Sequence, residues 1–155
     1  MRRLNISNPE FTHDDEDPEG FRAGMVRPGP GWGAKTTGIS VYELPPGQSV
    51  CPYHYEYGSE EWLLVLNGRP TLRHPEGSDE LAPEDLVFFP PGPGGAHRVS
   101  NDTEATVRVL MFSDVVTPDA SVYPDSNKIG LFTGNPDDDI LVRRDTGLEY
   151  YDGEA

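Results

Sequence analysis

Short apolar runs alternate with breaks along most of the chain from residue 36 onwards. The runs are rich in β-branched residues, and proline or glycine interrupts them every several positions. This pattern is typical of antiparallel strands in a sandwich or barrel. It predicts strands at residues 37–44, 50–55, 61–66, 71–74, 85–89, 97–99 and 106–112. We therefore expect an all-β fold that forms a single-domain β-barrel.

The pattern divides the chain into three regions. Residues 1–35 are a lead-in with an acidic cluster at 14–17, a first strand at 21–26 and a proline- and glycine-rich loop at 28–33. Residues 36–114 form the barrel core. Residues 115–155 are an extension with apolar runs at 129–132 and 140–142. We expect this extension to pack on the barrel rather than to act as a lid over a site.

Two histidines and two glutamates stand out within the predicted strands. Side chains two residues apart on a strand share a face, so His54 and Glu56 are expected to point the same way. Glu61 shares its face with the apolar positions 63 and 65, and a buried carboxylate is costly unless it is paired or bound to a cation. Taken singly, His97 could be a surface histidine, Glu61 a strand-edge charge and His54 a core histidine. Together they predict a metal site.

The same residues fall into two motifs. Residues 54–68 read H-x-E-x4-E-x6-G, and residues 90–101 read P-P-G-x4-H-x3-N. In this order and spacing they resemble the two conserved motifs of the cupin superfamily, over about residues 36–112. The resemblance implies a jelly-roll barrel, the double-stranded β-helix of a small type 2 cupin. It also implies that His54, Glu61 and His97 are metal ligands.

The main departure from the family pattern is Glu56, which stands where a second histidine is usual. We expect it to be a fourth ligand; the alternatives are that it faces solvent or hydrogen-bonds to a ligand. Two imidazoles and two carboxylates suit one divalent ion. The carboxylates favour Mn or Fe, while the general affinity series also admits Ni or Zn.

The family resemblance implies three kinds of function. The leading hypothesis is a metalloenzyme, of dioxygenase or isomerase/epimerase type, that acts on a small oxygen-rich organic molecule. Arg98 is a weak candidate for a substrate contact, since its strand parity differs from that of His97. No general acid or base stands out beyond the ligands. The alternatives are a metal-dependent small-ligand binding or sensory module without turnover, and a structural barrel with a vestigial site.

The net charge and the cysteine content limit the possible binding partners and the cellular compartment. The chain has 27 acidic against 12 basic residues and a net charge of −15, which excludes nucleic acid as a partner because phosphate binding needs clustered basic groups. Because the chain shows no apolar stretch of the kind that a signal peptide or a membrane span needs, we expect neither. Cys51 is the single cysteine, and we expect a buried, inert thiol on the strand face opposite to His54. A cytoplasmic protein is predicted.

One strand is apolar on both of its faces. If Glu61 points inward, then Trp62, Leu64 and Leu66 point outward and need a cover. A second protomer, the N-terminal strand or the C-terminal segment could supply it. We expect a homodimer, because cupins commonly pair through such surfaces.

The acidic excess also predicts a response to salt. The chain contains only two lysines, Lys35 and Lys128, and a lysine-poor acidic surface is typical of proteins that fold in molar salt, where self-repulsion is screened. The alternative is an ordinary acidic protein. For a halophilic protein, the melting temperature should rise steadily from low to molar salt. A melting temperature that does not change over this series would contradict the halophilic assignment.

Overall fold

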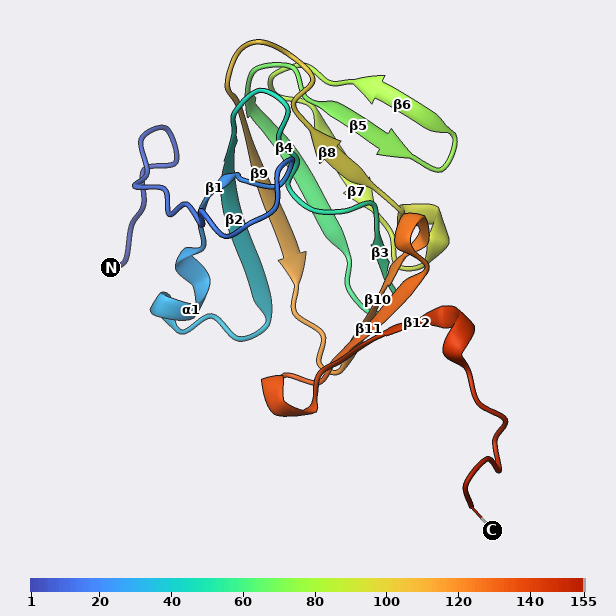
Figure 1. Cartoon of the computed structure of the whole chain (residues 1–155). Coiled ribbons are helices and arrows are strands. Elements are labelled where there is room, and N and C mark those ends of the chain that lie inside the picture. The colour runs from blue at the N-terminus through green and yellow to red at the C-terminus, as the bar shows by residue number, and fades with distance from the viewer. Residues whose placement is uncertain (155) are drawn as a thin grey trace.

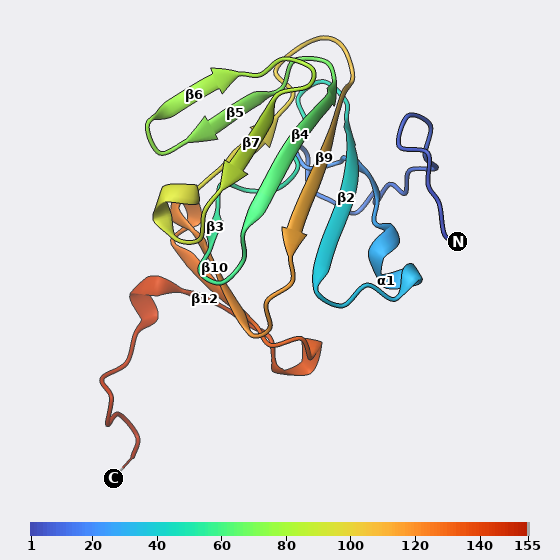
Figure 2. The ribbon, with the colours of Figure 1, turned by 180° about the vertical axis from the view of Figure 1, so that it is seen from behind.

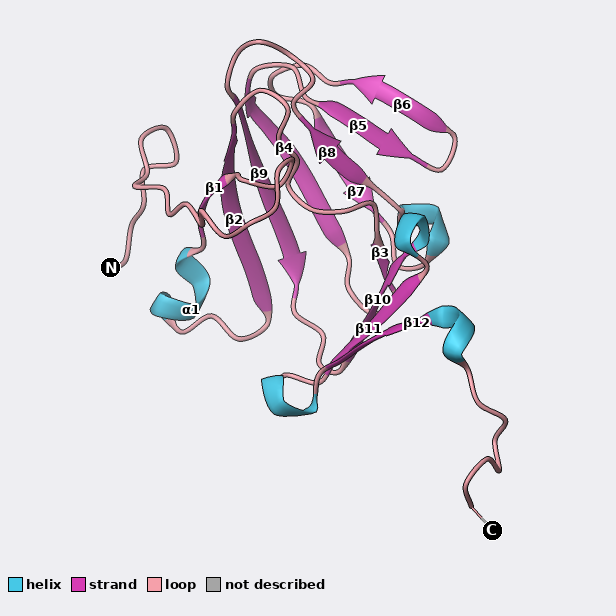
Figure 3. Cartoon of the chain, in the orientation of Figure 1, coloured by secondary structure: helices cyan, strands magenta, loops and turns pink. Residues whose placement is uncertain are grey.

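The computed structural model describes residues 1–154, most of which lie in strands or in the loops between them (Figures 1 and 3). One short helix, α1 (Pro28–Trp32), follows the first strand. The strands are β1 (Gly24–Val26), β2 (Thr37–Leu44), β3 (Tyr55–Glu56), β4 (Glu61–Asn67), β5 (Thr71–His74), β6 (Gly77–Glu80), β7 (Leu86–Phe89), β8 (Arg98–Ser100), β9 (Val107–Asp114), β10 (Asp119–Tyr123), β11 (Lys128–Phe132) and β12 (Ile140–Arg143). Single 3-10 turns lie at Pro93–Gly95 (η1), Pro124–Ser126 (η2), Pro136–Asp138 (η3) and Arg144–Thr146 (η4).

The strands form three antiparallel sheets. The largest has the order β1-β2-β9-β4-β7, and the others have the orders β6-β5-β8 and β12-β11-β10-β3. Isolated bridges between Ser49 and Ser100 and between His54 and His97 join the segment before β3 to the β8 segment. The five-stranded sheet therefore faces a wall made by the two smaller sheets. The predicted all-β fold is confirmed.

The core lies between these two walls. Alternate residues of β4 and β9 are buried, among them Leu63, Val65, Val107 and Val109. Burying one such side chain contributes about 1.5–3 kcal/mol. The cluster fills the barrel at the end of β4, whereas Glu61 lies where β4 begins, at the edge of a cavity. The inward direction of Glu61 thus follows from the alternation that buries Leu63 and Val65.

Three local predictions were wrong. Residues 50–53 are bends, so the strand expected at 50–55 is reduced to β3. The expected loop at 28–33 contains α1, because proline suits a first helical turn and Gly33, with a φ of 82°, ends the helix in the left-handed region. Strands β6 and β10 were not predicted. All four residues of β6 are exposed, so no apolar alternation marks it.

The terminal segments extend the sheets. Strand β1 pairs with β2 at the edge of the five-stranded sheet. Strand β10 pairs with β3, and β11 and β12 continue that sheet (Figure 1). The extension is therefore hydrogen-bonded to the segment that follows His54. Among the described residues, no helix has the length and apolar character that crossing a membrane requires.

The outer face of β4, β7 and β9 is apolar and open. Trp62, Leu64, Leu86, Leu110 and Phe112 line a shallow groove on it, and Phe88 packs on Trp62 with ring centroids 4.6 Å apart. Figure 2 looks onto β7, β4 and β9 with no described segment in front of them. Neither the N-terminal strand nor the C-terminal extension covers this face. We therefore propose that a second copy of the chain covers it.

The dimer is tested by placing a charge in this face. Leu86 is 62% exposed, so Leu86→Asp should leave the single chain folded while it disrupts a pairing that needs an apolar surface. Light scattering at micromolar protein is expected to give the mass of two chains for the parent and of one chain for the variant. Leu148→Asp, in the exposed C-terminal tail, is the matched control and should remain a dimer. A one-chain mass for the parent would refute the pairing.

Candidate metal centre

Three residues from separate segments meet inside the barrel. His54 precedes β3, Glu61 opens β4, and His97 lies between η1 and β8. The main chains of His54 and His97 are paired, with N···O distances of 3.1 and 2.8 Å in the two directions. One ligand atom from each of the three residues lies within 4.8 Å of the others. Backbone pairing therefore sets the positions of the two imidazoles, and strand alternation sets that of the carboxylate.

His97 is held in a defined orientation. Its Nδ1 lies 2.9 Å from the Gly95 carbonyl, and the Phe89 ring stacks on it at 3.7 Å. Gly95 is required there because a Cβ would collide with the Pro90 carbonyl. Burial, reinforced by the charge of His54, lowers the pKa of His97 to about 4. At neutral pH the imidazole is therefore uncharged, with Nδ1 donating to Gly95 and the Nε2 lone pair free.

Glu61 faces this lone pair. Its Oε2 lies 3.4 Å from His97 Nε2, and the exposed fractions of the two side chains are 19% and 1%. Burial first, and then the neighbouring Glu56, raise the pKa of Glu61 to about 7, against the opposing charges of His54 and Arg27. Neither Glu61 Oε2 nor His97 Nε2 has a hydrogen-bond partner, although both atoms are buried.

Two buried acceptors that face each other repel unless a proton or a metal cation lies between them. A divalent ion ligated by both would satisfy Glu61 Oε2 and His97 Nε2 at once. The residues present therefore fit a metal.

His54 is oriented in the same way as His97, through a main-chain carbonyl at its Nδ1. Its Nδ1 lies 3.0 Å from the Pro52 carbonyl, so this nitrogen donates and Nε2 is directed toward the site. Nε2 is 2.9 Å from Glu56 Oε1, and the Cys51 sulfur lies 3.4 Å from Nδ1. Burial lowers the pKa of His54, but the contacts with Cys51 and Glu56 outweigh it and raise the pKa overall. The Tyr123 ring, from β10, stacks against His54 at 5.9 Å.

Glu56 lies on the same side as His54, but outside the group of three ligand atoms. Its carboxylate lines the cavity and contacts the His54 nitrogen that would bind a metal. This geometry is compatible with a fourth ligand and with a hydrogen-bond partner of His54. Ligation by Glu56 stays a prediction.

Two other residues differ from expectation. Cys51 lines the cavity beside His54 instead of facing away, because the bends at 50–53 break the strand alternation on which that prediction depended. Arg98 is not among the residues that line the cavity; its guanidinium donates to Ser49 Oγ at 2.8 and 3.1 Å. A substrate contact for Arg98 therefore stays a prediction, which neither its position nor its strand parity supports.

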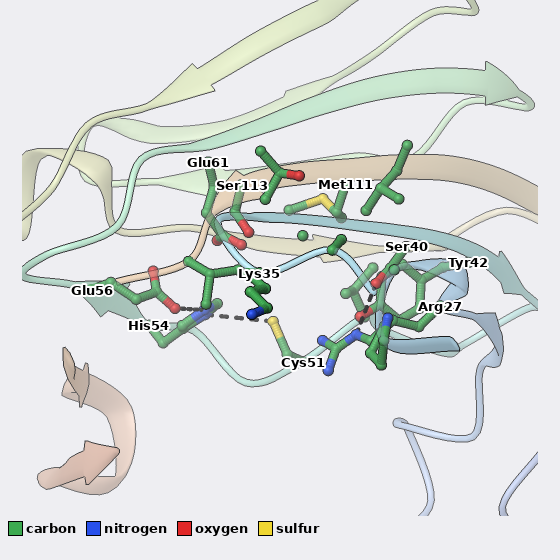
Figure 4. Close-up of a pocket in the computed structure, with 18 residues that line it drawn as sticks. Arg27, Lys35, Ser40, Tyr42, Cys51, His54, Glu56, Glu61, Met111 and Ser113 are labelled. Atoms are coloured by element: carbon green, nitrogen blue, oxygen red, sulfur yellow. Dashed lines mark hydrogen bonds and ion pairs between the residues drawn. The ribbon is translucent and has the colours of Figure 1, made fainter. Parts of the chain in front are cut away.

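A cavity of about 470 Å³ adjoins the centre (Figure 4). Glu61, Met111 and Ser113 line one part of it, and residues from the region of α1 and β2 line another, including Arg27 and Lys35. Sequence reasoning missed Arg27, Lys35 and Tyr123. They belong to no motif, and only the folded chain brings the lead-in and the extension to the centre.

The comparisons agree with this geometry. Residues 40–113 match the model of the family described as "Cupin domain". A candidate sugar phosphate isomerase from Acidithiobacillus ferrooxidans is 26% identical, with a TM-score of 0.81 over 93% of this chain and 91% of that chain. A sugar phosphate isomerase of the cupin superfamily from Silicibacter pomeroyi is 20% identical, with a TM-score of 0.80 over 97% and 98%.

The fold also occurs with a different activity. A polyketide cyclase from Streptomyces resistomycificus is 21% identical, with a TM-score of 0.60 over 74% of this chain and 79% of that chain. Comparison with curated proteins gave no match. The domain match shows that residues 40–113 form a cupin domain, and the similar structures show that the cupin fold extends over most of the chain.

Proposed function

We propose that this protein is a metal-dependent isomerase that acts on a small phosphorylated sugar. The observation that carries the proposal is the pair of buried, unpartnered acceptors, Glu61 Oε2 and His97 Nε2. Of the two residues, Glu61 lines a cavity large enough for a small molecule. The likeness to a candidate sugar phosphate isomerase over nine tenths of both chains supports the reaction class.

The proposed ligands are His54, Glu61 and His97, with Glu56 as the fourth. A bound divalent ion would supply polarisation of a substrate carbonyl. Two imidazole nitrogens with carboxylate oxygens suit Mn or Fe and also accept Ni or Zn. The chain's own part is to keep Nε2 of both histidines directed inward, through the Pro52 and Gly95 carbonyls.

Isomerisation suits the contents of the cavity. The reaction moves the carbon-bound proton of the neighbouring CH(OH) group to the carbonyl carbon and its hydroxyl proton to the carbonyl oxygen, so that the carbonyl shifts by one carbon and no external oxidant is needed. Glu56 and Glu61 are the carboxylates that line the cavity. Burial raises the pKa of Glu61 to about 7, so metal binding near neutral pH must displace its proton.

Metal binding is tested by removing one ligand. His97→Ala should weaken the binding of Mn(II) and Zn(II) by more than about a hundredfold, because a buried ligand atom is lost. The parent, loaded at a hundred times its dissociation constant, should gain about 2.7 kcal/mol of unfolding free energy from the metal, and the variant almost none. His74→Ala is the control, since His74 contacts Glu76 and Asp79 on the β5–β6 hairpin.

The same titrations test Glu56 and the role of pH. Glu56→Gln should weaken metal binding by at least about tenfold; an unchanged affinity would exclude ligation by Glu56. Because protons on both Glu61 and His54 compete with the metal, affinity should rise by at least about tenfold per unit as pH increases from 5.5 to 7. Full metal occupancy in His97→Ala would show that the centre is wrongly assigned.

The reaction is tested with metal-loaded protein and a panel of aldose and ketose phosphates. NMR should detect interconversion within the panel that depends on the metal and is lost in His97→Ala, while an oxygen electrode should detect no uptake. Metal-dependent oxygen consumption would refute the assignment as an isomerase and indicate a dioxygenase. If a sugar phosphate binds but is not converted with any of the metals, the protein is a ligand-binding module and the proposed enzymatic activity is refuted.

A further inference from the structure

Charges of both signs line the cavity. His54, Glu56 and Glu61 lie at the metal centre, while Arg27 and Lys35 line the same cavity from the lead-in region. Figure 4 shows Arg27 at the side of the cavity away from Glu56, beyond Cys51, and Lys35 between Arg27 and the carboxylates in this view. Arg27 is close enough for its charge to act on the pKa values of Tyr42 and Glu61.

Arg27 is held at the entry to the helix. It lies between β1 and α1, and its Nε donates to the hydroxyl of Ser40, a β2 residue that is only 5% exposed. This bond fixes the inner edge of the guanidinium and leaves its two terminal nitrogens available. A guanidinium offers paired N–H donors whose geometry matches the oxygens of a phosphate or a carboxylate.

Lys35 lies in the connection between α1 and β2 and also lines the cavity. It is one of only two lysines among 155 residues. Within residues 1–154, no carboxylate forms an ion pair with Arg27 or Lys35, whereas Arg69, Arg73 and Arg108 are each paired with one. Two cations beside one cavity therefore keep their charge available for a ligand.

We propose that Arg27 and Lys35 form a subsite that binds the phosphate group of the substrate. The subsite rests on the proposed function, because it would hold the far end of a molecule whose carbonyl end lies at the metal centre. A phosphate monoester carries close to two negative charges at neutral pH, which two cations match. On a chain with a net charge of −15, such a ligand is otherwise repelled, so a local positive patch is needed to admit it.

The test measures the affinity for inorganic phosphate by calorimetry, with and without bound Mn(II), at low ionic strength. The metal-free parent should bind phosphate, more tightly than acetate by at least about tenfold, since a monoanion meets both cations with half the charge. The double variant Arg27→Gln/Lys35→Met should lose at least about tenfold in affinity. Arg27→Lys should retain part of the binding, because it keeps the positive charge but loses the paired N–H donors of the guanidinium.

Two controls distinguish binding at this subsite from a general effect of surface charge and from damage to the metal centre. Arg69→Gln/Arg144→Gln removes two positive charges outside the cavity and should bind phosphate as the parent does. Mn(II) affinity of the Arg27/Lys35 variant should be unchanged, which shows that the centre is intact. Equal phosphate affinity in the parent and the Arg27/Lys35 variant would overturn the subsite, as would an equal loss in the control variant.

Failure of the subsite and failure of the proposed function give different results. If His97→Ala loses metal and turnover but still binds phosphate, the subsite stands independently of the chemistry. If the metal-loaded parent isomerises a sugar phosphate with an unchanged KM in Arg27→Gln/Lys35→Met, the function stands and the subsite is refuted.

Discussion

A buried carboxylate and a buried imidazole face each other at 3.4 Å without a hydrogen-bond partner for either acceptor atom. Such a contact is unfavourable in a polypeptide alone, because two desolvated acceptors cost free energy and repel. The contact persists because the neighbouring residues hold both side chains in place. The Gly95 carbonyl and the Phe89 ring orient His97, and the alternation of β4 turns Glu61 inward. A divalent cation ligated by both atoms resolves the conflict, in competition with a proton on Glu61.

The packing and main-chain pairing of the rest of the barrel position Glu61 and His97 for this contact. The aliphatic cluster around Leu63 and Val65 closes one end of the barrel, so that the centre lies at the edge of a cavity and not in a solid core. The main-chain pairing of His54 with His97 brings two segments that are far apart in sequence to one point. Strand β10 then adds Tyr123 against His54, so the C-terminal extension forms part of the wall around the centre.

Much of this arrangement could be predicted because it depends on local rules. Strand β2 was predicted with its observed bounds, and Glu61 was placed correctly, because alternation between a buried and an exposed face leaves a direct trace in the sequence. The position of Cys51 was predicted wrongly for the same reason: residues 50–53 bend, and parity does not apply to a bend. Arg27, Lys35 and Tyr123 reach the cavity only through tertiary contacts, which no periodicity encodes.

The proposed function depends on the binding of one divalent ion by His54, Glu61 and His97 inside the barrel. X-ray absorption spectroscopy of the metal-loaded protein observes these ligands directly. We predict a first shell of nitrogen and oxygen at about 2.0–2.2 Å for zinc, with the outer-shell scattering of two imidazole rings that becomes one ring in His97→Ala. A spectrum without imidazole scattering, or one that is identical in parent and variant, would contradict this ligand assignment.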